Sequence, residues 1–297
     1  MPGRQLLDED HLSDHGSGLL RPDMVRRREV LKETLDRFLK ADPPDKYHAI
    51  ARKNLGVWSK FPRVTLSSGQ QVRVVSGDWG EVALRLTQDH GACFAVLNMA
   101  NAYVPGGAYI EGAVAQEENI FRRTNCHFCI SSEEYDPVTD RYRPEWTRLI
   151  SGQNERVYLD SENPRVCLRG SEDRTSPNLG YSWLREDHIF PFYELRSAAN
   201  DLRDGSPFSA EVMRNRISAQ LDTLIEKGIH HVVLGAFGCG AFKNPSESVA
   251  EIYWEQINKR RTHFSVIAFA IYNAGYGPGN FKPFSSVFSR KIILGER

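Results

Sequence analysis

The residues best suited to chemistry lie in segment 104–123, which is VPGGAYIEGAVAQEENIFRR. Gly106 and Gly107 leave the backbone bare, so successive N–H groups can approach a ligand with no side chain in between. Glu117 and Glu118 are neighbours in sequence. Neighbouring helical residues do not face each other, so the two carboxylates cannot act as one bidentate group. We therefore expect them to have separate roles.

Glu118 is the stronger candidate for acid–base catalysis. No helix breaker follows Gly112, which predicts a helix directly after the loop with both glutamates in its early turns. Glu118 then shares an apolar face with Val114 and Phe121. Burial there and the charge of Glu117 raise its pKa, whereas the helix N-terminus lowers it. A carboxyl that donates a proton to a leaving group and then takes one from water suits glycosidic hydrolysis; the alternative is two acidic residues that only stabilise the helix dipole.

A second glycine loop, GAFGCGAFKNP at 235–245, follows the apolar run HHVVL, as the first loop follows CFAVLN. In an open α/β sheet the ligand site lies beyond the carboxyl ends of the strands. Two glycine loops at such ends suit the two phosphates of a diphosphate. Neither loop contains Gly-Lys-Ser/Thr, and Lys243 stands where a dinucleotide fingerprint has its last glycine, so those two motifs are excluded. Each loop taken singly also fits a tight strand-to-helix turn.

Short apolar runs alternate with helical patterns over most of the chain. This alternation predicts an α/β fold with a mostly parallel central sheet covered by helices on both faces. Asp78 is a plausible N-cap for the helix after the first strand. The expected strands are 72–75, 93–100, 229–236 and 264–271, with further strands near 156–159 and 165–168; the expected helices are 23–41, one within 45–62, 78–91, 209–228, and one opened by Pro245 and Ser246.

The composition predicts three regions. Residues 1–22 are expected to be a flexible tail, residues 23–70 a helical extension packed on the core, and residues 71–297 the catalytic core. Segment 125–190 is rich in charge, proline and glycine and interrupts the alternation, which indicates an insertion.

The bulk composition excludes several classes of protein. Of 297 residues, 38 are basic and 38 acidic, and a chain without net charge lacks the basic surplus that nucleic-acid binding requires. Because no apolar run approaches 18 residues and the first thirty are charged, we expect no membrane span or signal peptide and an intracellular, cytoplasmic protein. Five cysteines do not indicate a disulfide scaffold, and the pair Cys126 and Cys129 around His127 lacks further zinc ligands.

The two loops together resemble a known family. In poly(ADP-ribose) glycohydrolases, NPGGG is followed by six to eight residues and then QEE; here VPGGA at 104–108 is followed by seven residues and then Gln116, Glu117 and Glu118. Segment 233–245 is similar to the diphosphate loop of the bacterial-type members, and segment 194–202 to the stretch before their long helix. The likeness covers about residues 72–285.

The resemblance implies a three-layer α/β/α macrodomain with a mixed, mostly parallel sheet, and hydrolysis without a metal or another cofactor. It makes Glu118 the general acid and base and Glu117 the residue that orients the ribose. Tyr272, Asn273 and Phe281 are candidates for adenine contacts. The substrate-binding residues it implies are Asn101, Gly106, Gly107, Ala108, Gln116, Gly235, Phe237, Gly238, Cys239, Gly240, Ala241, Phe242, Tyr272 and Asn273.

Departures from the family pattern leave the substrate open. Ala108 replaces the third glycine, and an acidic stretch, SSEEYDPVTDRY at 131–142, would suit the guanidinium of an arginine substrate if it lies near the site. The expected substrate is ADP-ribose in poly(ADP-ribose) or on ADP-ribosylated protein, cleaved by a monomer without nucleic acid or membrane. The alternatives are a hydrolase of single, arginine-linked ADP-ribose, a module that binds ADP-ribose without cleaving it, and a hydrolase of free ADP-ribose derivatives.

Overall fold

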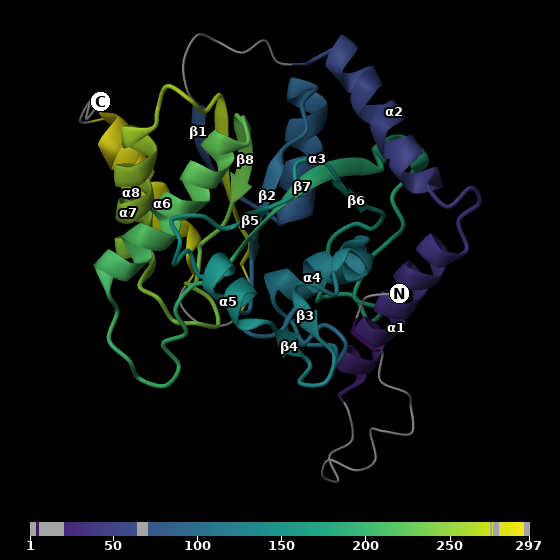
Figure 1. The fold of residues 1–297 in the computed structure, drawn as a ribbon. Helices are drawn as coiled ribbons and strands as arrows, with labels where there is room; N and C mark the ends of the chain where they lie inside the picture. The colour runs from purple at the N-terminus through teal and green to yellow at the C-terminus, as the bar shows by residue number, and fades with distance from the viewer. Residues whose placement is uncertain (1–3, 6–20, 64–70, 274, 276–278, 294–297) are drawn as a thin grey trace.

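The computed structural model describes residues 4–5, 21–63, 71–273, 275 and 279–293. Its centre is a mixed sheet in the order β1-β9-β8-β2-β7-β5, with β6 also paired to β7 (Figure 1). The strand pairs from β1 to β7 are parallel, and β5 and β6 run antiparallel to β7. The predicted α/β fold with a mostly parallel sheet is confirmed.

The sheet strands are β1 (Gln71–Ser76), β2 (Ala95–Met99), β5 (Tyr158–Leu159), β6 (Arg165–Cys167), β7 (Phe190–Ser197), β8 (His231–Leu234) and β9 (Val266–Ile271), and β3 (Tyr135–Asp136) pairs with β4 (Arg141–Tyr142) in a separate hairpin. The helices are α1 (Pro22–Leu39), α2 (Lys46–Lys60), α3 (Trp79–His90), α4 (Gln116–Arg123), α5 (Pro144–Ile150), α6 (Ala210–Glu226), α7 (Ser246–Lys259) and α8 (Phe281–Ile293), with 3-10 turns η2 (Cys126–Cys129) and η3 (Glu186–His188).

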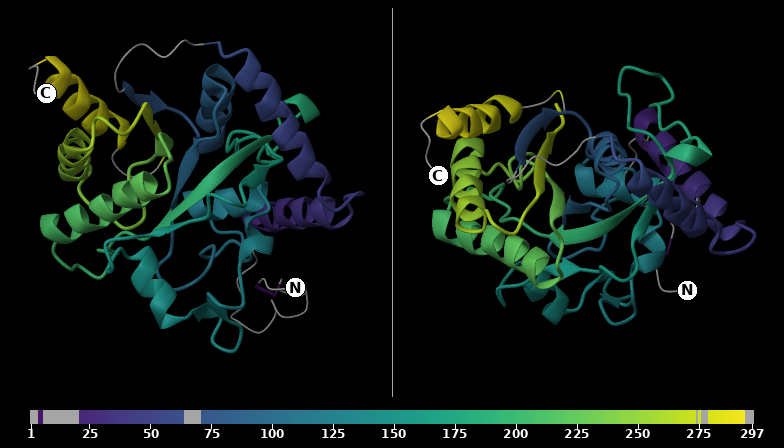
Figure 2. Two further views of the ribbon diagram at one scale, coloured as in Figure 1. Left: turned by 45° about the horizontal axis from the view of Figure 1, so that its top comes forward. Right: turned by 90° about the horizontal axis from the view of Figure 1, so that it is seen from above.

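Helices cover both faces of the sheet (Figures 1 and 2). One apolar cluster joins α6, α7 and α8 to one face, and a second joins α1, α3 and α4 to the other. All six residues of β9 are buried because the strand lies between these two layers. This three-layer arrangement leaves the carboxyl ends of the parallel strands free for loops that carry a site.

Local signals for the predicted helices are seen in the structure. The Asp78 carboxylate accepts hydrogen bonds from the N–H groups of Gly80 and Glu81 and caps α3. Gly91 ends that helix in the left-handed conformation, with φ of 61°. One apolar position differs from the helical spacing read from the sequence: Val212 of α6 is exposed, and the adjacent Met213 is buried in its place. At its N-terminal end, α6 therefore buries the position one residue after the predicted one.

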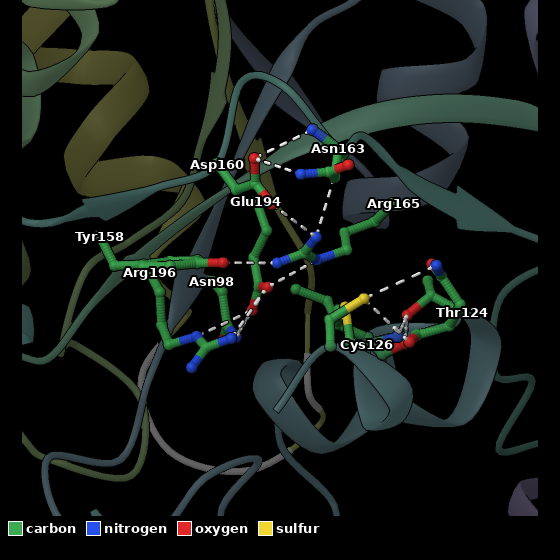
Figure 3. A network of polar contacts seen from close by, with 12 residues as sticks. Asn98, Thr124, Cys126, Tyr158, Asp160, Asn163, Arg165, Glu194 and Arg196 are labelled. Carbon is green, nitrogen blue, oxygen red and sulfur yellow. Dashed lines mark hydrogen bonds and ion pairs between the residues drawn. The ribbon is translucent and has the colours of Figure 1, made fainter. Parts of the chain in front are cut away.

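The sequence patterns did not predict β7, α5, α8 or the β3–β4 hairpin. β7 is a central strand, and it was missed because Glu194 and Arg196 interrupt its apolar pattern. Both side chains are fully buried and belong to a network of polar contacts that also includes Asn98 and Arg165 (Figure 3). Segment 125–190 also contributes β5 and β6 to the central sheet, and its origin as an insertion stays a prediction.

The N-terminal helices pack on the sheet side opposite α6, α7 and α8 (Figures 1 and 2). In α1, the apolar residues Val30, Leu31 and Leu35 are buried, whereas Val25 and Leu39 are exposed. Most of the predicted tail lies outside the described residues. Within those residues, no helix is long and apolar enough to cross a membrane.

Candidate active site

A cavity of about 970 Å³ opens at the carboxyl ends of the parallel strands. Both glycine loops contribute to its wall, together with the start of α4. It therefore joins segments that lie more than a hundred residues apart in the sequence. Of the sequence-predicted residues, those lining it are Asn101, Ala108, Gln116, Glu117, Glu118, Gly235, Gly238, Cys239, Gly240, Ala241, Phe242, Tyr272 and Asn273.

Three predicted site residues lie elsewhere. Phe237 is fully buried in the apolar cluster beneath α6 and α7, so its ring packs the core and does not face a ligand. Gly106 and Gly107 are not among the residues that line the cavity, and their φ values are 75° and 60°. A Cβ on Gly107 would overlap Oε1 of Glu118, so the close approach of this loop to α4 requires glycine.

α4 begins at Gln116, later than the predicted start directly after Gly112. The Gln116 side chain accepts a hydrogen bond from Met99 N (2.9 Å) and donates one to Leu97 O (2.6 Å). These two bonds fix the first turn of α4 against the end of β2. Both glutamates are consequently in the early turn of the helix, as predicted, but Val114 precedes the helix and shares no helical face with Glu118.

The two carboxylates make separate contacts with the first loop. Glu117 accepts hydrogen bonds from Asn101 N (2.6 Å) on Oε2 and from Gly106 N (3.1 Å) on Oε1. Glu118 accepts one from Ala108 N (3.1 Å) on Oε1. Its Oε2 atom is buried and has no hydrogen-bond partner among the described residues. One carboxylate is thus fully used by the backbone, whereas the other keeps an oxygen free.

The surroundings of the pair favour retention of a proton. Burial raises the pKa of Glu118, and the N–H of Ala108 and the charge of Arg122 act against that rise. Burial, followed by the negative charge of Glu118, raises the pKa of Glu117 well above its usual range. Backbone N–H groups contact both oxygens of Glu117, whereas Oε2 of Glu118 is left free to hold a proton.

The second loop is held by Asn244, which the sequence did not single out. Its Nδ2 group donates to Asn200 O (2.8 Å) and to Gly238 O (3.0 Å). Among the described residues beyond its two neighbours in the chain, no heavy atom comes within 4 Å of the position that a Cβ on Gly240 would take. Burial raises the pKa of the Cys239 thiol to about 12, so this cysteine stays protonated at neutral pH.

The far end of the cavity contains residues that could contact a base. Tyr272 and Asn273 follow β9, and the Tyr272 ring is 43% exposed, with the Arg174 guanidinium 5.4 Å from its centre. Asp78, which follows β1, also lines this end and could have been found from its place at a strand's carboxyl end. Phe281 is not among the lining residues but begins α8.

The acidic stretch 131–142 does not line the cavity. Glu134 is buried and paired with Arg196 (2.6 Å), and Asp140 is paired with Arg4 (2.6 Å). Arginines of the chain itself thus occupy two carboxylates of this stretch, and none of its residues lines the cavity, so the geometry does not support its expected role as a guanidinium site.

Asn101 also serves the fold: its Oδ1 accepts from the N–H groups of Tyr103 and Val104 and shapes the first loop. Around Cys126 and Cys129, as in the other described parts of the chain, no group of three or more His, Cys, Asp and Glu side chains is placed to hold a metal. His127 is instead hydrogen-bonded through Nδ1 to the Tyr109 hydroxyl (2.7 Å).

Part of the chain matches a protein family model, and solved structures are similar in fold to most of the chain. Residues 44–150 match the family model of the microbial-type PARG catalytic domain. The solved poly(ADP-ribose) glycohydrolase (PARG) of Thermomonospora curvata is 22% identical, covering 88% of this chain and 98% of that chain with a TM-score of 0.59. The Deinococcus radiodurans PARG in complex with ADP-ribose is 20% identical, covering 83% and 92% with a TM-score of 0.54. No curated protein matches the chain.

These comparisons confirm the resemblance to microbial-type PARG over residues 44–150, the part of the chain that carries the first loop and both glutamates, and they confirm the fold. The family match starts at residue 44, earlier than the expected residue 72, and includes α2. The expected boundary at residue 70 stays a prediction.

Proposed function

We propose that this protein is an ADP-ribosyl hydrolase that cleaves the glycosidic bond of ADP-ribose in poly(ADP-ribose), with Glu118 as general acid and base. The observation that carries the proposal is the Oε2 atom of Glu118, which is buried, lacks a partner among the described residues, and belongs to a side chain that lines the cavity. The match of residues 44–150 to a PARG catalytic domain supports the same conclusion.

In this proposal the two glycine loops hold the diphosphate. The N–H groups around Gly240 and the open space at that residue suit a phosphate. Tyr272 and Asn273 lie at the end of β9, on the far side of the β8 loop from β2, and we assign them to the adenine. The reacting ribose then lies at the β2 loop, beside Glu117 and Glu118.

The reaction begins with transfer of the Glu118 proton to the leaving oxygen as the bond from that oxygen to the anomeric carbon breaks. Glu117, whose orientation is set by Asn101 N and Gly106 N, faces the ribose and stabilises its developing positive charge. Water then adds its hydroxyl to the anomeric carbon and returns its proton to Glu118. Glu118 thus supplies the proton for the leaving group and regains one from water, so it ends the cycle in the state in which it began.

Two alternative functions can be weighed against the structure. The arginine-linked mono-ADP-ribosyl substrate is less favoured, because Asp140 and Glu134 of the acidic stretch are already paired with arginines of the chain. A non-catalytic binding module would use both glycine loops but would have no need for a buried carboxyl with a free oxygen.

The test is incubation of the protein with poly(ADP-ribose), with mono-ADP-ribosylated protein and with small ADP-ribose esters, followed by assay of released ADP-ribose. We expect release from the polymer and a loss of about 10²–10⁴-fold in kcat for Glu118→Gln, with ADP-ribose affinity by calorimetry unchanged. Full turnover by the Gln variant would remove Glu118 from the mechanism. Binding without release from any substrate would establish the non-catalytic module.

A further inference from the structure

Arg4 reaches the candidate active site from the first residues of the chain. Its side chain is buried, although the sequence predicted a flexible tail here. Nη1 donates a hydrogen bond to Gly107 O (2.5 Å), and Nε and Nη2 donate to the two carboxylate oxygens of Asp140 (2.8 and 2.6 Å). The guanidinium also lies 5.6 Å from the centre of the Tyr109 ring and 3.6 Å from the Glu111 carboxylate.

The contact with Gly107 acts on one particular peptide group. The carbonyl of the Gly107–Ala108 peptide accepts from Arg4, and the N–H of the same peptide donates to Oε1 of Glu118 (3.1 Å). Because a peptide is planar, fixing the direction of its carbonyl also fixes the direction of its N–H. Gly107 has a φ of 60° and no Cβ, so without an added contact this peptide has more freedom to rotate than one between larger residues.

We propose that Arg4 is a positioning residue for Glu118, and that it acts by holding the Gly107–Ala108 peptide so that its N–H points at the carboxyl. The proposal rests on the proposed function for the role of Glu118 in turnover. Its geometric part concerns only the peptide and the two side chains bound to it.

The hairpin formed by β3 and β4 gives Arg4 a rigid support. Asp140 lies in the turn of this hairpin with a φ of 52°, and its Oδ1 also accepts a hydrogen bond from the Tyr135 hydroxyl (2.7 Å). The Arg4 guanidinium is therefore fixed on one side by a paired carboxylate and on the other by the Gly107 carbonyl. This contact gives Asp140, in the acidic stretch that does not line the cavity, a role in supporting the first loop.

The charges around Glu118 decide what loss of the contact would do. Burial and the charge of Glu111 disfavour the ionised form of Glu118, whereas the Ala108 N–H and the charge of Arg122 favour it. If the peptide rotates, the carboxylate loses its N–H donor and the balance moves toward the protonated form. The pKa of Glu118 should then rise further, and the alkaline limb of the pH–rate profile should move to higher pH.

The experiment compares the full-length wild type with Arg4→Ala and Arg4→Lys. Lysine keeps the charge but cannot make the forked contact to Asp140 and Gly107 together. Arg21→Ala is the matched control, because Arg21 also precedes α1 but its side chain is 71% exposed and is paired with Asp23 (3.6 Å). One readout is kcat/KM on poly(ADP-ribose) against pH. The other is an NMR titration of the Glu118 side-chain carboxyl carbon, assigned by its absence in Glu118→Gln.

We expect Arg4→Ala to raise the Glu118 midpoint and the alkaline limb by about one pH unit and to lower kcat/KM about tenfold. Arg4→Lys should give a smaller shift in the same direction, and Arg21→Ala none. An unchanged carboxyl titration in a folded Arg4 variant would overturn the proposal, as would an equal effect of Arg21→Ala. If Arg4→Ala does not fold, Arg4→Lys decides. A wild type without turnover would contradict the proposed function alone, since the carboxyl titration still tests Arg4.

Discussion

At the scale of single residues, two neighbouring glutamates differ because of the backbone that each one meets. Their adjacency in sequence was enough to predict separate roles, and the structure gives Glu117 two N–H donors and Glu118 one. The burial of Glu118 could not be predicted from the sequence. Glu118 is buried because the loop through Gly107 folds back over α4, and no helical spacing encodes that contact.

The raised pKa of Glu118 predicts a cost in stability at high pH. A carboxyl whose pKa is raised on folding contributes stability below its unfolded pKa of about 4.3, and this contribution is lost as the pH rises. Glu118→Gln removes the charge but keeps an oxygen for Ala108 N. We therefore expect this variant to melt at a higher temperature than the wild type at pH 8, by about 2–4 °C for each 1 kcal/mol gained. The difference in melting temperature should vanish near pH 4. A Glu118→Gln variant that melts below the wild type at pH 8 would contradict the raised pKa of Glu118.

At the scale of elements, β7 shows why pattern analysis fails for some central strands. Alternating and continuous apolar patterns both assume that buried positions are apolar. In β7 the fully buried Glu194 accepts from Asn98 (2.8 Å) and Arg165 (3.2 Å) (Figure 3). Arg196 donates to Glu134 (2.6 Å). The partners come from β2, β6 and the acidic stretch, so only the folded chain reveals that these charges are compensated.

Arg196→Met is expected to destabilise the protein by about 3–5 kcal/mol, because it leaves Glu134 and Glu194 buried with fewer compensating charges. Urea denaturation followed by circular dichroism measures the change. Arg156→Met is the matched control: Arg156 forms an exposed pair with Glu226, and its loss should destabilise the protein far less because water screens the pair. Equal effects of the two substitutions would mean that the buried network contributes no more than a surface pair.

At the scale of the whole molecule, the sequence predicted the alternating core well because its strands and helices are marked by local signals, such as the Asp78 cap and the apolar run of β9. It did not predict how the N-terminal helices join that core. α1 reaches α4 through Thr34, whose hydroxyl lies 2.7 Å from Arg122 O, and Arg27 of α1 pairs with Glu172, which lines the cavity. These contacts join residues about ninety or more positions apart, and local patterns carry no information about them.

The same contacts predict that α1 and the core unfold as one cooperative unit. Thr34 Oγ1 is buried, lies within hydrogen-bond distance of Arg122 O, and accepts from Arg169 Nε (2.9 Å). Thr34→Val keeps the shape but leaves both groups without this partner, which should cost about 1–3 kcal/mol. Calorimetry should show a single transition at lower temperature, whereas the control Thr139→Val, at an exposed turn position, should change stability by less than about 0.5 kcal/mol. Two separate transitions would instead show that α1 is an independent extension, and its contact with Arg122 would then have no effect on the stability of the core.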